Sequence, residues 1–229
     1  MAMISPEVQE ATKKKLSSEM AERVTILFFT QEPSRLVLPD RLQGQECLYC
    51  QETRQLLEEV VSLTDKIDLR THDFVAEKAK ADELGVDKIP AIVISPEQGY
   101  GIRFFGIPSG YEYVSLLEAV VDVSRRRTAL AEKTKTALAD LANDVHIQVF
   151  VTPTCPYCTL AVRLAHQFAV ESPRIRADMV EATEFPHLAQ KYHVFGVPKT
   201  VINEAVFIEG AVPESVFLDH VLRAAKPVR

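Results

Sequence analysis

The sequence lacks the compositional extremes that mark several protein classes. Its 229 residues include no tryptophan, 8 glycines and 13 prolines, while 47% are hydrophobic and 25% are charged. Collagen-like and low-complexity chains contain far more glycine and proline, and disordered chains contain fewer apolar residues. The composition therefore predicts a folded chain with a buried core, long enough for one large domain or two of modest size.

A surplus of basic residues is also missing. The 26 lysines and arginines are outnumbered by 32 aspartates and glutamates, which leaves a formal net charge of −6. Proteins that bind nucleic acid usually neutralise its phosphates with a basic surface. We therefore expect no nucleic-acid partner.

Long hydrophobic runs are absent as well. The longest uncharged stretch, residues 145–162, contains Pro153, Pro156 and several polar side chains, which is wrong for a membrane-spanning helix. Three lysines at residues 13–15 are not followed by the apolar segment of a signal peptide. These features predict a soluble, cytoplasmic protein without a membrane partner.

Cysteine is scarce, but its arrangement is informative. The four cysteines form two pairs, Cys47 with Cys50 and Cys155 with Cys158, and two residues separate the members of each pair. Intracellular proteins seldom keep such pairs as inert bridges, and a C-x-x-C pair that follows a strand usually has a redox role. The pattern predicts an enzyme that exchanges thiols and disulfides.

The two halves of the chain repeat one pattern at an offset of 108 residues. This offset superposes the two cysteine pairs, and it also superposes Ile89-Pro90 on Val197-Pro198. Each copy is about 110 residues, long enough to form its own core. We expect two units, residues 1–124 and 125–229, with a boundary near residues 124–127.

Periodicity and turn residues predict the same order of elements, αβαβαββα, in both halves. This order indicates an α/β fold of two tandem units, each with a central mixed sheet flanked by helices. The first half contains 13 extra residues ahead of its cysteines, roughly residues 31–45, which we interpret as a surface loop. The expected strands are 24–30, 67–72, 91–94 and 102–105, then 145–151, 175–180, 200–202 and 206–208; the expected helices include one from Pro6, 74–84, 111–123, 128–141 and one from Glu214.

A cysteine at the start of a helix is suited to disulfide exchange. Unpaired backbone N–H groups and the helix dipole favour a thiolate there, and the thiolate is the form that attacks a disulfide. We therefore predict Cys47 and Cys155 as nucleophiles. Cys50 and Cys158, one helical turn further on, would attack the mixed disulfide and release the partner.

Other interpretations of the cysteines stay open. The two pairs could bind one zinc ion in a protein without catalytic activity, although the pairs of zinc knuckles are usually much closer in sequence. Each pair could also be a static structural disulfide. No G-x-G-x-x-G or P-loop string is present, so we predict no bound cofactor and assign any flavin or nicotinamide to a partner.

The residues around the second pair resemble a known family. Cys155-Pro156-Tyr157-Cys158 is the active-site string of glutaredoxins, and Val197-Pro198 begins 42 residues after its first cysteine, as in the thioredoxin fold. With an intact pair in each half, the chain resembles the glutaredoxin-like protein disulfide oxidoreductases of thermophilic archaea and bacteria. The N-terminal part of alkyl hydroperoxide reductase flavoproteins is also similar, but it typically keeps one working pair. An electron relay to a peroxidase is therefore the alternative function.

The resemblance implies how substrates are bound. Ile89–Pro90 and Val197–Pro198 should be cis peptide bonds beside the cysteines, which leaves the preceding backbone free to pair with an extended substrate. The substrates would be protein dithiols and disulfides, and a thioredoxin reductase-like flavoprotein would be an electron partner. Tyr49 and Tyr157, inside the two motifs, could flank a docking groove or simply cover apolar surface.

The sequence departs from the family pattern in several places. The first site reads Cys-Leu-Tyr-Cys, and neither half has the tryptophan that precedes the thioredoxin pair. Val149 stands where thioredoxins place a buried aspartate, so the proton acceptor of the second site is unassigned. We interpret His166 as a surface or hydrogen-bonded histidine. The chain has only two asparagines, a scarcity typical of heat-adapted proteins.

Charge predicts that the two sites are unequal. Residues 1–124 contain 13 basic and 21 acidic residues, whereas residues 125–229 contain 13 and 11. Glu46 precedes Cys47, while uncharged Thr154 precedes Cys155, so repulsion should hold the pKa of the first thiol above that of the second. We hypothesise that the second pair meets protein substrates, while the first pair uses a different partner or reacts more slowly.

Overall fold

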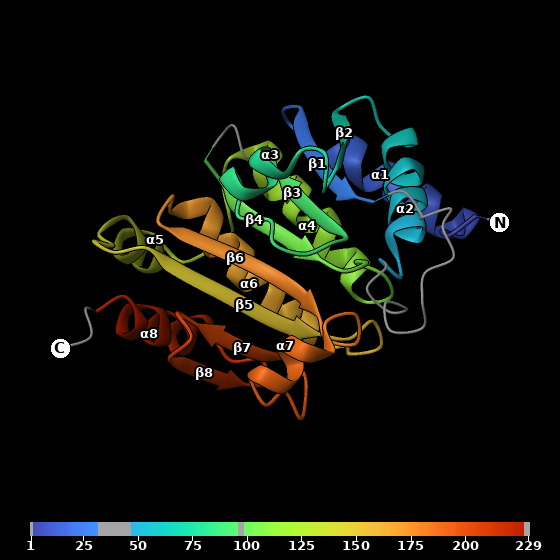
Figure 1. Cartoon of the computed structure of the whole chain (residues 1–229). Helices are drawn as coiled ribbons and strands as arrows, with labels where there is room; N and C mark the ends of the chain where they lie inside the picture. Colours follow the sequence, from blue (N-terminus) through green and yellow to red (C-terminus); the bar gives the residue numbers. More distant parts are fainter. Residues whose placement is uncertain (1, 32–46, 96–98, 227–229) are drawn as a thin grey trace, which may run out of the picture.

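The computed structural model describes residues 2–31, 47–95 and 99–226, and it contains one αβαβαββα unit in each half of the chain (Figure 1). The element order predicted from the sequence is therefore confirmed. The elements of the first half are α1 (Pro6–Glu19), β1 (Val24–Thr30), α2 (Cys50–Ser62), β2 (Ile67–Asp73), α3 (Lys78–Glu83), β3 (Ala91–Ile94), β4 (Gly101–Phe105) and α4 (Glu112–Arg125). Those of the second half are α5 (Glu132–Ala139), β5 (Val145–Val151), α6 (Cys158–Glu171), β6 (Ile175–Glu181), α7 (Pro186–Lys191), β7 (Lys199–Ile202), β8 (Val206–Glu209) and α8 (Glu214–Ala224).

Two helices are shorter than predicted. α3 begins at Lys78 and not at residue 74, because the carboxylate of Asp73 accepts hydrogen bonds from the backbone N–H groups of Val75 (2.9 Å) and Ala76 (2.7 Å). These bonds hold the segment ahead of α3 in turns. α5 likewise begins at Glu132, later than expected.

The eight strands form one continuous sheet in the order β2-β1-β3-β4-β6-β5-β7-β8. Each half contributes four neighbouring strands, and the halves join where β4 pairs in parallel with β6, from Gly101 opposite Arg176 to Phe105 opposite Val180. The mixed sheets expected for the two units are thus joined edge to edge. The boundary near residues 124–127 remains a prediction.

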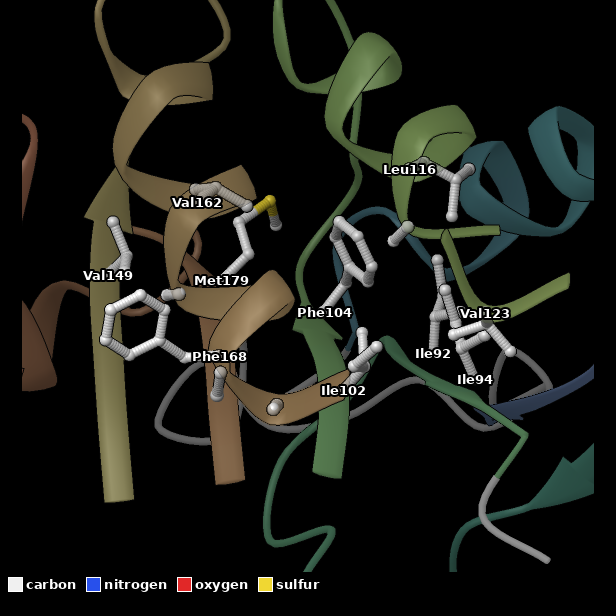
Figure 2. Close-up of a cluster of buried hydrophobic side chains, with 14 of the residues drawn as sticks. Ile92, Ile94, Ile102, Phe104, Leu116, Val123, Val149, Val162, Phe168 and Met179 are labelled. Carbon is white, nitrogen blue, oxygen red and sulfur yellow. The ribbon is translucent and has the colours of Figure 1, made fainter. Parts of the chain in front are cut away.

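Helices cover both faces of the sheet because the central strands bury side chains on both sides. Phe28 and Phe29, adjacent on β1, are both fully buried and belong to opposite cores, as the alternation of side chains along a strand requires. The larger core lies under α1, α2, α4, α5, α6 and α8, and the smaller one includes residues of α3. Figure 2 shows that the larger core continues across the junction, with Phe104 of β4 between Ile92 of the first half and Met179 of the second.

A buried ion pair also joins the halves. Arg103 on β4 donates two hydrogen bonds of 2.7 Å to the carboxylate of Asp178 on β6, directly opposite, and both side chains are almost fully buried. Burial alone would raise the pKa of Asp178, but Arg103 and His146 outweigh burial and hold it well below its ordinary value. Arg103 also donates to the carbonyl oxygen of Gly85 (2.6 Å), so its charge is well satisfied.

The loop predicted ahead of the first cysteine pair falls almost wholly on residues 32–46, outside the described residues. Within the part of the chain that the structure describes, no helix combines the length and the apolar character needed to cross a bilayer.

Candidate redox sites

The two cysteine pairs follow corresponding strands of the sheet. α2 begins after β1, and α6 begins after β5. β1 and β5 run in the same direction, because β1 and β4 both pair antiparallel with β3, and β4, β6 and β5 are mutually parallel. Their C-terminal ends therefore meet one edge of the sheet. Since α2 and α6 both pack on the larger core, both pairs also lie toward the same face.

The sulfurs are paired within each motif. Cys47 is bonded to Cys50 and Cys155 to Cys158, and the Cα atoms of each pair are 5.5 Å apart. The structure thus contains two separate disulfides, and no cluster of metal-binding side chains occurs among the described residues.

The two sulfurs of a pair differ in position. Each helix begins at the second cysteine, not at the first as expected, because the two intervening residues form a turn. Cys50 and Cys158 are almost fully buried, whereas Cys47 is partly exposed and Cys155 is slightly more accessible than its partner. The first cysteine of each pair is therefore the better placed to meet a partner.

The proline loops have the geometry that the resemblance implied. Ile89–Pro90 and Val197–Pro198 are both cis. At the second site the sulfur of Cys155 lies 3.7 Å from the carbonyl oxygen of Val197, so the loop borders the disulfide. Contact of either loop with a substrate remains a prediction.

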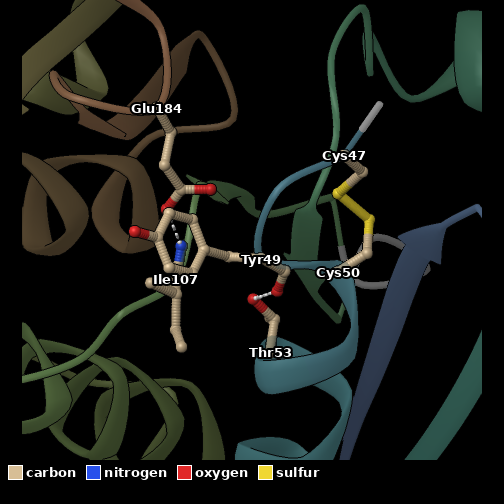
Figure 3. Close-up of a disulfide and its surroundings, with 6 residues drawn as sticks. All are labelled: Cys47, Tyr49, Cys50, Thr53, Ile107 and Glu184. Atoms are coloured by element: carbon tan, nitrogen blue, oxygen red, sulfur yellow. Dashed lines mark hydrogen bonds between the residues drawn. A yellow bond between two sulfur atoms is a disulfide. The ribbon is translucent and has the colours of Figure 1, made fainter. Parts of the chain in front are cut away.

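The two motif tyrosines are accessible. Tyr157 is 66% exposed and Tyr49 is 41% exposed, and the carbonyl of Tyr49 accepts a hydrogen bond from the Thr53 hydroxyl (2.6 Å) at the start of α2 (Figure 3). Both side chains therefore remain candidates for docking a partner. Glu46, on which the expected pKa difference rests, lies outside the described residues.

Glu112, at the start of α4, is a candidate that the sequence did not identify. Its side chain is 1% exposed, and neither carboxylate oxygen has a hydrogen-bond partner within the described residues. Burial raises the pKa of Glu112 to about 7. A carboxyl with this pKa can exchange a proton near neutral pH.

The register of α4 against α6 gives the height of Glu112 relative to the second cysteine pair. Glu118 accepts a hydrogen bond from Arg163, and Asp122 accepts one from Gln167, so residues 45 apart in sequence lie level on the two helices. The same register puts Glu112 level with residue 157, directly ahead of Cys158. A glutamate in the first turn of a helix is normally exposed, and so the sequence contained no signal for this placement.

Glu184 has a related position near the first site, although it belongs to the second half. Its carboxylate accepts a hydrogen bond from Ile107 N (2.6 Å), and Figure 3 shows both residues in the surroundings of the Cys47–Cys50 disulfide. Burial, followed by the negative charges of Glu181 and Glu52, raises the pKa of Glu184 to about 7. Glu184 is half-buried, so the second half supplies a carboxyl of raised pKa to the surroundings of the first half's disulfide.

His166 has a structural role, as interpreted from the sequence, but it does not lie on the surface. The side chain is 2% exposed, and neither ring nitrogen has a hydrogen-bond partner among the described residues. Its ring instead packs edge-on against Phe104, with the centroids 4.7 Å apart. Burial lowers the pKa of His166 to about 4, so the imidazole is neutral at neutral pH. It behaves as a core side chain and lies on the face of α6 that packs on the junction of the halves.

Comparison with known proteins agrees with this geometry. A thioredoxin domain model matches residues 145–223, which is the second unit from β5 into α8. A protein disulfide oxidoreductase from Aeropyrum pernix K1 is 31% identical, with a TM-score of 0.86 over 96% of this chain and 93% of that one.

The alkyl hydroperoxide reductases form a second group of relatives. The structure of the alkyl hydroperoxide reductase AhpF from Enterococcus faecalis, a C503A mutant, is 26% identical, with a TM-score of 0.83 over 95% of this chain and 99% of that chain. Among curated sequences, the corresponding alkyl hydroperoxide reductase protein from Xanthomonas campestris pv. phaseoli is 28% identical over 160 residues, 69% of this chain. The match spans only 28% of that protein's length.

Proposed function

The chain belongs to the family of protein disulfide oxidoreductases, and on this premise we propose that it reduces, forms or isomerises disulfides of other proteins through its two cysteine pairs. The observation that carries the proposal is the arrangement at each site, where a more accessible sulfur stands directly ahead of a helix that begins at a buried one. Cys47 and Cys155 are the nucleophiles, and Cys50 and Cys158 are the resolving cysteines.

In the reductive direction the dithiol form of the second site carries the electrons. The thiolate of Cys155 attacks one sulfur of the substrate disulfide, and a mixed disulfide forms as the other substrate sulfur leaves and takes up a proton. The thiolate of Cys158 then attacks the sulfur of Cys155, which releases the second substrate thiol. Two electrons have passed to the substrate, and the enzyme keeps the Cys155–Cys158 disulfide. Disulfide formation is the same sequence in reverse.

Glu112 is proposed as the proton acceptor that the second site requires. Cys158 must lose its proton to attack, and it is fully buried in the larger core. Glu112 is level with this cysteine and carries a pKa of about 7, so it can take the proton in the reductive direction and return it in the other. Glu112 on α4 would thus be the proton acceptor that Val149 on β5 cannot be.

The test of the proposed function is turnover of a protein disulfide by site-specific variants. Insulin reduction and reactivation of scrambled ribonuclease are measured with the parent, with Cys155→Ser/Cys158→Ser, with Cys47→Ser/Cys50→Ser, and with all four cysteines replaced by serine. We expect the first variant to lose most activity and the variant that lacks both pairs to lose all of it. Unchanged turnover in the variant that lacks both pairs would refute the proposal.

A second candidate function is an electron relay to a peroxidase. The match to AhpF over 99% of the compared chain favours it, although the chain matches only 28–35% of the length of the curated relatives. In this case the partners are a thioredoxin reductase-like flavoprotein and a peroxiredoxin. Rapid reduction of a peroxiredoxin together with negligible insulin and ribonuclease activity would favour the relay.

We also propose a cytoplasmic location in a heat-adapted organism. Two asparagines in 229 residues fit the scarcity of thermolabile side chains in such proteins. Intracellular disulfides are common in some hyperthermophiles, so an enzyme that makes or repairs them would have substrates there.

A further inference from the structure

The loops ahead of the two cis-prolines differ in chemistry. At the offset of 108 residues, Phe195 of the second unit corresponds to Asp87 of the first. The Asp87 carboxylate pairs with the ammonium group of neighbouring Lys88, whose side chain is mostly buried, so the first loop presents a charged rim. Phe195 has no such partner and is 93% exposed, the highest value among the large hydrophobic side chains of the described residues.

Phe195 belongs to the loop that borders the reactive sulfur. The carbonyl oxygen of Val197 is 3.7 Å from the sulfur of Cys155, and Phe195 precedes Val197 by two residues, a Cα separation of at most about 7 Å. A partner whose disulfide meets Cys155 must therefore lie against this loop. Tyr157 and Leu160, at the start of α6 on either side of Cys158, are exposed apolar side chains as well.

Contacts of a buried lysine hold the loop of residues 193–197 in place. The buried side chain of Lys199 donates a hydrogen bond to the carbonyl of His193 (3.0 Å) and forms an ion pair with Glu209 (2.9 Å). The ring of His193 stacks on that of Phe195. The residue that corresponds to Lys199 in the first unit is Ala91, which cannot make these contacts. Phe195 is thus exposed on an anchored loop.

We propose that Phe195, in the docking surface formed by residues 193–197, sets a preference of the second site for protein substrates with an extended, apolar segment next to their disulfide. The inference rests on the proposed function and adds its substrate class. An exposed phenylalanine is stabilised by burial against an apolar side chain, whereas Asp87 in the first unit would lose hydration in the same contact. The second site therefore takes apolar polypeptide, and the first site selects a polar partner.

The experiment uses two synthetic peptides, each with one intramolecular disulfide, flanked either by phenylalanine and leucine or by serine and glycine. The enzyme is the full chain with Cys47→Ser/Cys50→Ser, reduced beforehand, so that only the second site reacts. Single-turnover reduction of each peptide is followed over a range of peptide concentrations. Hydroxyethyl disulfide, too small to reach the loop, reports whether the dithiol itself is intact.

Phe195→Asp is compared with Phe195→Leu and with Val216→Asp, which changes a similarly apolar, exposed residue on α8 of the same unit. We expect Phe195→Asp to raise the peptide concentration needed for half-maximal rate about tenfold or more for the apolar peptide, the factor that follows from losing the burial of one aromatic side chain. The polar peptide and hydroxyethyl disulfide should react unchanged. Phe195→Leu should keep most of the preference, and Val216→Asp all of it.

The outcomes separate the two proposals. If the Phe195→Asp variant reduces the apolar peptide with the same kinetics as the enzyme with the unmodified loop, the inference about Phe195 is wrong while the proposed function stands. If the surface instead covers a second copy of this chain, Phe195→Asp will convert a dimer to a monomer by light scattering without changing peptide kinetics, which also overturns the inference. The proposed function itself is refuted by a different result, unchanged insulin reduction in the variant that lacks both cysteine pairs.

Discussion

The backbone N–H of Tyr111 donates a hydrogen bond of 3.0 Å to the carbonyl of Pro153, which ties the first half of the chain to the loop just ahead of Cys155. Tyr111 directly precedes Glu112, so the same contact fixes the start of α4 against the second site. The second site is therefore built from both halves. Loss of this contact should affect exchange at Cys155 more than exchange at Cys47.

Gly110→Ala tests this contact. Gly110 has a φ of +59°, and an added Cβ would collide with the carbonyl oxygen of Pro153. We expect a slower second site, measured in the Cys47→Ser/Cys50→Ser background, and a loss of stability in urea greater than the roughly 1 kcal/mol of left-handed strain alone. Gly99→Ala is the matched control, because Gly99 has a φ of +79° with open space around its Cβ position. Equal effects of the two variants would argue against the coupling.

Glu112→Gln removes the proposed proton acceptor while keeping its shape. The rate of the second site at pH 7 should fall about a hundredfold, a typical contribution of general acid–base catalysis, and the inflection near pH 7 should disappear. Glu118→Gln, on the same helix, should keep the pH profile because its carboxylate is paired with Arg163. A Glu112→Gln variant with the same pH profile as the parent would show that Glu112 is not the proton acceptor.

The same substitution has a predictable effect on stability. The pKa of Glu112 is raised from 4.5 to about 7, so between these values the folded state binds more protons than the unfolded state. The free energy of unfolding of the parent should therefore fall as pH rises through this window, by about 3 kcal/mol from this group. Urea unfolding of parent and variant from pH 4 to 8 gives the difference, in which Glu184 cancels. A difference in unfolding free energy that does not change with pH would show that Glu112 is not desolvated.

His166 should have the opposite dependence on pH. Its pKa falls from 6.5 to about 4 on folding, so the unfolded state binds more protons in this range and stability is lost as pH falls. His166→Leu should remove a loss of about 3 kcal/mol between pH 6.5 and 4. Thermal unfolding across this range measures it, with exposed His187→Gln as the control. A parent and a His166→Leu variant with parallel pH profiles would contradict the burial of a neutral imidazole.

The Arg103–Asp178 pair should matter most when half of it is removed. Arg103→Met leaves the carboxylate of Asp178 buried without its main partner, and we expect a loss of about 3–5 kcal/mol in unfolding free energy. Arg103→Met/Asp178→Leu should recover most of this loss, because a buried ion pair is often replaceable by apolar side chains. Equilibrium unfolding in urea of the single and double variants completes the comparison. A double variant no more stable than the single one would mean that the pair contributes net stability.

Local patterns predicted the strands well and the contacts between the halves poorly. Val24–Thr30, Ala91–Ile94 and Val145–Val151 begin and end where alternation and flanking turn residues place them. The pairing of β4 with β6 could not be predicted. The sequence predicts both as buried strands, but it does not indicate which neighbouring strand either of them pairs with. Register between strands of different units is a property of tertiary packing.

Some residues of the candidate site could likewise be predicted from the sequence, and others could not. The cysteines and the prolines carry a motif and a spacing, and the pairing of the sulfurs and the two cis bonds agree with the prediction. Glu112 and His166 sit on helices at positions whose exposure depends on the neighbouring unit. Their burial follows from α4 packing on α6, which no local periodicity encodes. The exposed Phe195 is likewise visible only once the loop is placed.

The central claim is that the first cysteine attacks and the second resolves, and trapping tests it most directly. In the Cys47→Ser/Cys50→Ser background, Cys158→Ser should accumulate a covalent mixed disulfide with a peptide disulfide substrate, attached at Cys155 and visible by intact mass spectrometry. Cys155→Ser should accumulate almost none, because its remaining thiol is buried. Equal adducts in the two variants, or none with Cys158→Ser, would contradict the account.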